Sequence, residues 1–140
     1  RTRAGAYKAA VDYDAIKLMK ENVSIPVIAN GDIKDFDTYN KVMEYTKADG
    51  AMIGRGAIGK PWVFYQIKHG VEDIDNDLKR EIIIEHLNAM VKFHGEYGTV
   101  MFRKFLHSYS KGYQGANTFR EIINTVKDVD VMRDMIETFF

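Results

Sequence analysis

Two polar turns, each directly after a short apolar run, carry the side chains best suited to chemistry. The first turn has the sequence NGD and the second has GRG. A glycine lets backbone N–H groups approach an anion closely, and an arginine offers a bidentate, charge-assisted contact to a phosphate. The candidate ligand-binding residues are Asn30, Gly31, Asp32, Gly54 and Arg55. Taken singly, each turn is better explained as a helix-initiating turn and the arginine as a solvated charge, but the two turns together favour a phosphate site.

The elements around these turns are predicted to form a strand, a helix and a second strand. The strands are expected at Ile25–Ala29 and Ala51–Ile53, and the first has the composition of a strand buried on both faces of a parallel sheet. Between them, apolar residues recur at helical spacing at positions 36, 39, 42, 43 and 48. Ligands of parallel α/β proteins lie beyond the carboxyl ends of the strands, so both turns should open on one face. This pattern indicates the last two strands of a (β/α)8 barrel.

Further helices are predicted on both sides of this unit. Asp12 or Asp14 can cap a helix that precedes the first strand, and Asp35 or Asp37 can cap the helix between the strands. A helix is expected over 57–67, with Pro61 in its first turn. Trp62 is expected to be a packing residue, because it lies among other apolar residues.

After the acidic stretch at 72–77 the pattern predicts helices alone. They are expected from residue 78 to about 94, from about 100 to 111, over 118–126 and over 131–139, with Asn117 and Asp130 as candidate caps. Residues 1–70 are therefore predicted to be the α/β part of the chain, and 71–140 a small all-α bundle.

Composition excludes several function classes. The 20 basic and 20 acidic side chains balance, so there is no general electrostatic attraction to RNA. There is no cysteine and no run as long as a membrane span, which makes a cytoplasmic protein the default expectation. The histidines lack the HExxH spacing and a cysteine partner, so no metal site is predicted. They are His69, His86, His94 and His107.

One charge feature lies in the helical part. There is no acidic residue between Glu96 and Glu121. The basic candidates in this stretch are Arg103, Lys104, His107, Lys111 and Arg120. Three of them are spaced four apart and would line one helix face opposite aromatic residues, which suits contact with a nucleic-acid backbone. A solvated helix face is the competing interpretation.

The same residues resemble a known family. IPVIANGDI followed by ADGAMIGRGAIGKPWVFYQI is similar to the C-terminal half of the barrel of tRNA-dihydrouridine synthases (the Dus family, DusB-like). FRKFLHSYSKGYQGANTFR resembles the helical domain of these enzymes, and the likeness extends over nearly the whole chain. Other flavin barrels share a glycine-bearing phosphate site, but not GRGAIGKPW followed by this helical tail.

The resemblance implies a flavin-dependent oxidoreductase that reduces uridine to 5,6-dihydrouridine in tRNA. FMN would be the cofactor, bound through the five turn residues, NADPH the reductant, and tRNA the partner of the helical domain. Arg1 and Arg3 would lie in a loop near the flavin. The family's catalytic cysteine has no counterpart here. Because a complete barrel takes roughly 250 residues, the chain is expected to be a fragment, inactive alone and prone to self-association through its incomplete barrel.

Two other functions fit the residues. In the first, the turns belong to a different barrel enzyme that binds a sugar phosphate. In the second, the chain is a non-catalytic RNA-binding module, in which the α/β part only supports the helices. Flavin in the full-length protein would separate the proposed enzyme from the first. Loss of RNA binding on charge reversal, in a protein without flavin, would favour the second.

Overall fold

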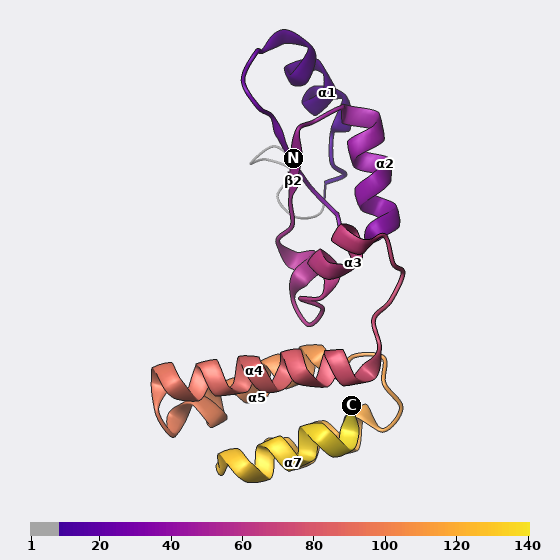
Figure 1. The fold of residues 1–140 in the computed structure, drawn as a ribbon. Coiled ribbons are helices and arrows are strands. Elements are labelled where there is room, and N and C mark those ends of the chain that lie inside the picture. Colours follow the sequence, from indigo (N-terminus) through magenta and orange to yellow (C-terminus); the bar gives the residue numbers. More distant parts are fainter. Residues whose placement is uncertain (1–8) are drawn as a thin grey trace. The chain divides into compact units, whose positions relative to one another are not determined.

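The computed structural model describes residues 9–140, which divide into two compact units (Figure 1). The first unit contains the described residues up to Ala57 together with Val63–Glu72. The second contains Ile58–Trp62 together with Asp73–Phe140. The chain therefore passes from the first unit to the second more than once. Arg1 and Arg3 lie outside the described residues.

The first unit combines a small sheet with helices. Its elements are α1 (Tyr13–Asn22), β1 (Ile28–Asn30), α2 (Phe36–Thr46), β2 (Gly50–Met52), the 3₁₀ turn η1 (Arg55–Ala57) and α3 (Val63–His69). The order strand, helix, strand is the predicted one. The observed strands differ in their bounds: β1 begins and ends later than predicted, and β2 begins one residue earlier.

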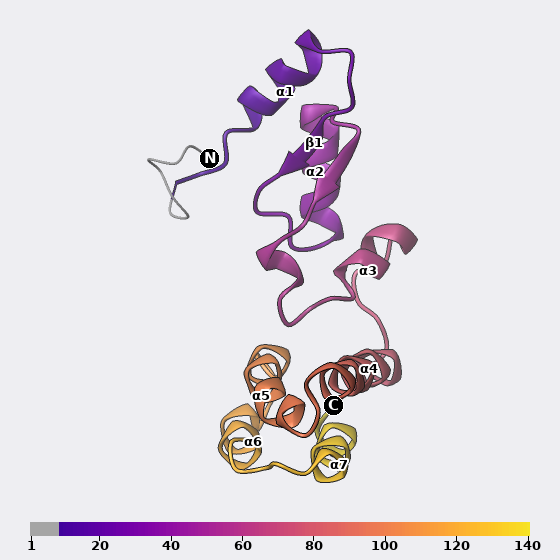
Figure 2. The ribbon, with the colours of Figure 1, turned by 90° about the vertical axis from the view of Figure 1, so that its left-hand side faces the viewer.

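The two strands are parallel and adjacent (Figure 2). Their register pairs Ile28 with Gly50, Ala29 with Ala51, and Asn30 with Met52. Because successive side chains of a strand point to opposite faces, Ala29 and Ala51 share one face. The other face carries the residues at both ends of each strand.

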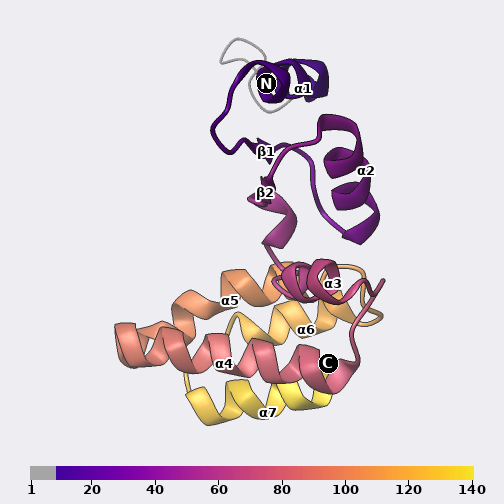
Figure 3. The ribbon, with the colours of Figure 1, turned by 45° about the horizontal axis from the view of Figure 1, so that its top comes forward.

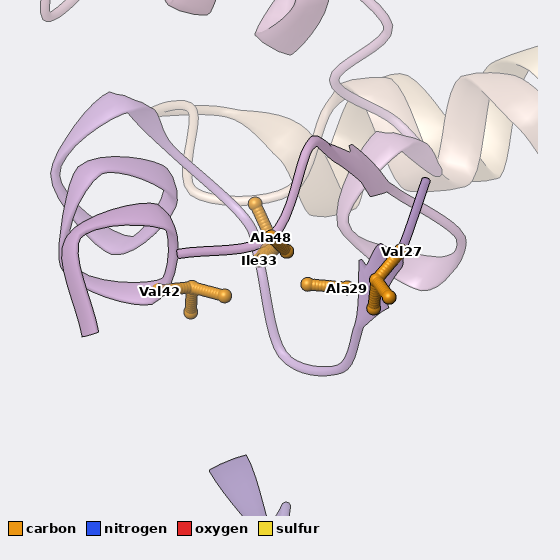
Figure 4. Close-up of a cluster of buried hydrophobic side chains, with 5 residues drawn as sticks. All are labelled: Val27, Ala29, Ile33, Val42 and Ala48. Atoms are coloured by element: carbon orange, nitrogen blue, oxygen red, sulfur yellow. The ribbon is translucent and has the colours of Figure 1, made fainter. Parts of the chain in front are cut away.

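A buried cluster lies between one face of the sheet and α2. Ala29 is fully buried, and Figure 4 shows the side chain of Val42 in α2 pointing toward it. Val27, Ile33 and Ala48 complete the buried set. Fully burying a side chain the size of valine or isoleucine contributes about 1.5–3 kcal/mol, so this cluster is a main source of stability in the unit.

The opposite face of the sheet is exposed, which corrects the prediction of a strand buried on both faces. Ile28 is 57% exposed and Met52 is 55% exposed, whereas Ala29 between them in the register is buried. The burial of β1 accordingly alternates along the strand. The apolar composition of 25–29 predicted a covered strand, but within the described residues only one face has a helix packed on it.

Carboxylates begin the first two helices, as predicted. Asp12 accepts a hydrogen bond from the N–H of Ala15 at 2.9 Å, and Asp35 accepts one from the N–H of Thr38 at 2.8 Å. Each satisfies one of the backbone donors that a helix N-terminus leaves without an intrahelical partner.

A third carboxylate joins α1 to the first strand. Asp49 accepts from Lys20 Nζ at 2.7 Å and from the N–H of Val27 at 2.7 Å. The pKa of the Asp49 carboxyl is lowered, chiefly by the hydrogen bond from Lys20 and to a smaller extent by the one from the N–H of Val27. The helix and the strand are therefore tied together just before β1 begins.

The helix predicted over 57–67 is shorter in the structure and begins later. α3 starts at Val63, and Pro61 precedes it instead of occupying its first turn. Gly59 has φ +74, a left-handed conformation that a right-handed helix does not contain. The helix therefore begins only after this residue.

The second unit is a bundle of four longer helices (Figure 3). They are α4 (Asn76–His94), α5 (Tyr97–Tyr109), α6 (Ala116–Ile123) and α7 (Val129–Phe139). α4 packs along α5 and also contacts α7. Ile83, Leu87, Phe102 and Leu106 are fully buried in this core. Among the described residues, no helix combines the length and the apolar character needed to cross a membrane.

Two predicted caps of this unit are wrong. Asn117 lies inside α6, which follows Gly115 at φ +78; that glycine allows the chain to turn sharply and begin the helix earlier. Asp130 lies in the first turn of α7, and the cap is Asp128, whose carboxylate accepts from the N–H groups of Asp130 and Val131 at 2.9 and 3.0 Å. Both helices thus start before the residue that the pattern indicated.

The short segment Ile58–Trp62 packs within the helical unit. A methyl group at Gly59 would lie 2.6 Å from the carbonyl oxygen of Ser108, so backbone meets backbone there. The Trp62 ring stacks with Tyr109 at a centroid distance of 6.0 Å, and Lys79 Nζ lies 5.9 Å from its centroid. Trp62 is buried, so its role as a packing residue agrees with the prediction.

Candidate functional site

The two predicted turns follow the same end of the sheet. Asn30 is the last residue of β1 and pairs with Met52, the last residue of β2. Since the strands are parallel, the chain leaves both of them at their carboxyl ends and in the same direction. Gly31 and Gly54 therefore stand at one edge of the unit, where open α/β sheets bind their ligands.

The first turn has an unusual backbone. Gly31 has φ +145 and Asp32 has φ +51, so the chain reverses through two positive φ angles in succession. A methyl group at Gly31 would lie 2.6 Å from a methyl carbon of Val11, and the hydroxyl of Tyr13 donates to the Gly31 carbonyl oxygen at 2.7 Å. The turn is thus covered and hydrogen-bonded by the start of α1.

Sequence reasoning missed Val11 and Tyr13 as supports of this turn. Val11 lies just before the cap of α1 and Tyr13 is the first residue of the helix, about twenty residues before the turn they contact. The sequence around Tyr13, next to the cap of α1, contains no local pattern that predicts such a contact.

The two glycines of the second turn differ in the space around them. A methyl group at Gly54 would have no heavy atom of the described residues within 4 Å, its chain neighbours aside, whereas one at Gly56 would lie 2.2 Å from the carbonyl oxygen of Ile33. Gly56 therefore lets the second turn pack against the backbone that follows the first. Gly54 instead faces open space, where a ligand group could approach the backbone.

An ion pair joins the two turns. Arg55 Nη2 lies 3.3 Å from Asp32 Oδ1, and the two side chains are 57% and 51% exposed. Arg55 begins η1, so its position depends on the short 3₁₀ turn closed by the hydrogen bond from the Ala57 N–H to the Gly54 carbonyl. All five predicted ligand residues therefore lie at or just after the carboxyl ends of two adjacent strands.

The chemistry of this donor set fits a phosphate. An exposed guanidinium beside a glycine that leaves its backbone accessible supplies a charged fork and room for close approach. The carboxylate of Asp32 is unfavourable for an anion by itself, but it is paired with the arginine. The arrangement could thus hold a phosphate group through Arg55 and the backbone of both turns.

The basic residues of the helical unit fall into two groups. Arg103 donates through Nε and Nη2 to the Val126 carbonyl oxygen at 3.1 and 2.7 Å, and Arg120 Nε donates to Ser110 Oγ at 2.9 Å. His107 Nε2 lies 3.0 Å from the side-chain oxygen of Asn124. These three side chains therefore connect parts of the unit, whatever else they contact.

The other two basic candidates are exposed lysines. Lys104 lies on α5, where its Nζ is 4.9 Å from the centroid of the Phe105 ring. Lys111 lies beyond the end of α5, because the helix stops at Tyr109 with Ser110 as its C-cap. The prediction that Lys111 continues the face of one helix is wrong, since the glycine after it, at φ +90, belongs to a turn.

A histidine and a tyrosine form a half-buried polar pair in the same unit. His86 Nδ1 and the hydroxyl of Tyr109 are 2.9 Å apart, and the histidine ring lies against Phe102 and Phe105. Burial raises the pKa of Tyr109 to about 12 and lowers the pKa of His86. The tyrosine thus remains a hydrogen-bond donor and the histidine a neutral acceptor, which is a packing arrangement and not a ligand site.

Neither the surface groove of the helical unit nor the acidic and histidine side chains provide a second polar site among the described residues. A groove between α6 and α7 is lined mainly by apolar side chains, including Phe119, Ile122 and Met135, and the charged residue in its lining is Asp134. An acid among apolar groups does not suit a phosphate backbone. Among residues 9–140, no group of three or more histidine, aspartate and glutamate side chains is placed to hold a metal ion.

Comparison with known proteins decides the family. The family model for dihydrouridine synthase (Dus) matches residues 1–140. The chain belongs to the dihydrouridine synthase family. A probable tRNA-dihydrouridine synthase of Helicobacter pylori is 43% identical over 141 residues. tRNA-dihydrouridine synthase B of Vibrio cholerae is 40% identical over 147 residues, and a probable tRNA-dihydrouridine synthase of Rickettsia bellii is 39% identical over 149.

The match covers all of this chain but less than half of each relative. The aligned part amounts to 43% of the Helicobacter protein, 46% of the Vibrio protein and 45% of the Rickettsia protein. Membership in the dihydrouridine synthase family confirms the resemblance seen in the two turns and the helical tail. These relatives are named as tRNA-dihydrouridine synthases.

Proposed function

We propose that this chain is the C-terminal part of an FMN-dependent tRNA-dihydrouridine synthase, which reduces uridine to 5,6-dihydrouridine with NADPH as reductant. The observation that carries the proposal is the meeting of the NGD and GRG turns at the carboxyl ends of two adjacent parallel strands. Family membership supports it. In this proposal β1 and β2 are the last strands of a (β/α)8 barrel whose other strands belong to the rest of the protein.

Residues of both turns would bind the phosphate end of the cofactor. Arg55 would pair with the phosphate, and the backbone at Gly31 and Gly54 would approach it closely. Tyr13 would keep the first turn in place through its hydrogen bond to Gly31. FMN, when bound, supplies hydride transfer, and these residues supply its position and the electrostatic environment of its phosphate. Asn30 completes this set at the end of β1.

In this proposal the chain supplies part of the cofactor-binding site, and the rest of the enzyme supplies the proton donor. The cysteine that the family uses as the proton donor has no counterpart here, because the chain contains no cysteine. The chain alone is therefore expected to be inactive. The whole enzyme would act in the cytoplasm, where its tRNA substrate is.

The helical unit would contact the tRNA. Lys104 and Lys111 are the exposed members of the basic set, so they can reach a phosphate backbone without breaking contacts inside the unit. Arg103, His107 and Arg120 have partners within the bundle and would contribute mainly by holding this surface together. The target uridine would have to leave its stacked position to reach the flavin.

Flavin content of the full-length protein tests the cofactor. Arg55→Ala should weaken FMN binding by on the order of 1.5–3 kcal/mol, because a charge-assisted contact is lost. Arg133→Ala is the matched control, since Arg133 is also paired with an aspartate at the surface, at 2.6 Å from Asp130. FMN content that is unchanged in Arg55→Ala, with a lowered melting temperature, would mark Arg55 as structural.

Charge reversal tests the RNA surface. Lys104→Glu and Lys111→Glu should each weaken tRNA binding and reduce its salt dependence by about one phosphate contact. Lys92→Glu, at an exposed position on α4, is the control for net charge. Equal losses in all three variants would mean that only the overall charge matters, and that this surface is not the binding site.

A further inference from the structure

Asp32 combines a left-handed backbone conformation with an ion pair to Arg55 in the second turn. Direct contact of its side chain with a ligand would explain neither feature. Its φ of +51 is a left-handed conformation, which residues with a Cβ adopt uncommonly. Among the described non-glycine residues, Lys47 shares this property, at the C-cap of α2, where such a conformation is usual. Among the described helices, the one nearest to Asp32 in the chain is α2, and its cap is Asp35. The backbone of Asp32 instead directs a carboxylate across to the second turn.

The carboxylate meets the guanidinium that the proposed function assigns to the phosphate. Asp32 Oδ1 lies 3.3 Å from Arg55 Nη2, although the residues are 23 positions apart in the chain. A guanidinium carries its N–H groups in a rigid planar fork, so a carboxylate at one edge restricts the direction of the others. The pair thus limits the rotamers of a long, exposed side chain.

Contacts with neighbouring residues hold the first turn in place, so it can fix the position of the Asp32 carboxylate. The Gly31 carbonyl oxygen is hydrogen-bonded to Tyr13, and the Gly31 backbone lies against the side chain of Val11, so the residue before Asp32 is held on two sides. Gly56, the middle residue of η1, packs against the backbone of Ile33. Both ends of the ion pair are therefore attached to turns that contact one another.

We propose that Asp32 is a positioning residue that acts through Arg55: its carboxylate holds the guanidinium in the direction needed to receive the cofactor's phosphate, and it does not itself bind the flavin. The inference rests on the proposed function, because the phosphate is that of FMN. It assigns Asp32 a role different from that of Gly31 and Gly54, whose backbone would contact the phosphate directly. An acid next to a phosphate is then explained by its pairing with the arginine.

Two substitutions separate the side chain from the backbone conformation. Glycine and asparagine both tolerate the left-handed region, so Asp32→Gly and Asp32→Asn keep the turn. Asparagine keeps the oxygen that accepts from Arg55, and glycine removes it. The measurement is a fluorescence titration of the full-length protein, freed of flavin, with FMN and with riboflavin, which lacks the phosphate.

Asp32→Gly should bind FMN about three- to fivefold more weakly, the upper part of the range expected for loss of one exposed ion pair, and should bind riboflavin as the wild type does. Asp32→Asn should stay within about twofold of the wild type for both flavins, since the hydrogen bond is kept. In an Arg55→Ala background, Asp32→Gly should cause no additional loss, because the residue acts through the arginine.

Several results would overturn the inference while leaving the proposed cofactor intact. They are FMN binding by Asp32→Gly that is unchanged or tighter, an equal loss for riboflavin, and an undiminished loss in the Arg55→Ala background. The last would show a direct contact, and the second a general distortion of the site. A wild-type protein that binds neither flavin would overturn the proposed function, and this inference with it.

Discussion

The hydroxyl of Tyr13 donates a hydrogen bond to the carbonyl oxygen of Gly31 at 2.7 Å. The carbonyl and N–H groups of a trans peptide point in opposite directions, so this bond also sets the direction of the Asp32 N–H. The start of α1 therefore controls the orientation of a peptide in the proposed phosphate site. This contact spans 18 positions of the chain and is partly buried.

Tyr13→Phe should weaken both folding and FMN binding. Loss of the hydrogen bond should lower the free energy of unfolding by about 0.5–1.5 kcal/mol. Tyr45→Phe is the matched control, because its hydroxyl donates to the exposed side chain of Asp14 and not to the turn. Thermal unfolding and FMN titration of the full-length protein provide the check. Equal FMN affinities for the two variants would show that Tyr13 does not support the site.

The two glycines of the second turn should respond differently to alanine. Gly56→Ala would place a methyl group 2.2 Å from the Ile33 carbonyl oxygen and 3.0 Å from the Lys34 Cα, both backbone atoms. The expected loss is on the order of 1–3 kcal/mol of unfolding free energy, since neither atom can move independently. Urea unfolding measures it.

Gly54→Ala should leave stability nearly unchanged, because its methyl group would meet none of the described atoms within 4 Å beyond its neighbours. If a phosphate occupies this space, the same substitution should reduce FMN binding. A destabilised Gly54→Ala protein, or a Gly54→Ala protein with unaltered FMN affinity, would argue against a ligand at this position.

Local chemistry predicted the first unit better than the second. The sequence reduced the caps of the first two helices to Asp12 or Asp14 and to Asp35 or Asp37, because these acids stand at the start of apolar helical patterns. In the structure the first acid of each pair is the cap, and its side chain accepts from a donor three residues away. The choice of Asp128 over Asp130 could not be made this way. Both are acids near the same helix start, and the outcome depends on where the chain leaves α6.

The roles of the basic residues show the same limit. Spacing placed Arg103 on a helix face, but its partner, the carbonyl of Val126, is 23 residues away in a loop. Sequence periodicity reports which side of a helix is polar, and does not report which loop closes over it. The exposed face of the sheet, with Ile28 and Met52, was missed for a related reason: apolar composition does not reveal whether a covering element is present.

Stability of the helical unit should fall as the pH falls below the ordinary histidine pKa of 6.5, because burial lowers the pKa of His86 in the folded protein. The unfolded chain then binds more protons than the folded one, so acid favours unfolding. His86→Gln should flatten this dependence between about pH 7.5 and pH 5, a window around the histidine pKa.

His94→Gln is the control for the same change at an exposed position of the same helix. The urea midpoint is compared as a slope against pH for the three proteins, so that a uniform loss of stability in one variant does not affect the result. A slope that is the same for wild type and His86→Gln would show that His86 is not responsible.

The isolated chain should associate with itself through the exposed face of its sheet. Ile28 and Met52 present apolar surface there, and the strand edges offer unpaired backbone groups. The mass measured by light scattering should rise with concentration, and Met52→Lys should suppress this rise. Ile122→Lys, at an exposed position of α6, should not. A monodisperse monomer at every concentration would contradict the expectation.

The dihydrouridine content of tRNA tests the proposed activity most directly. The full-length protein is incubated with NADPH and tRNA that lacks the modification, and the nucleosides are then separated and identified by mass spectrometry. The proposal predicts NADPH-dependent conversion of uridine to dihydrouridine, reduced in Arg55→Ala and restored in part by excess FMN. A folded, FMN-loaded protein that leaves every uridine unreduced would contradict it.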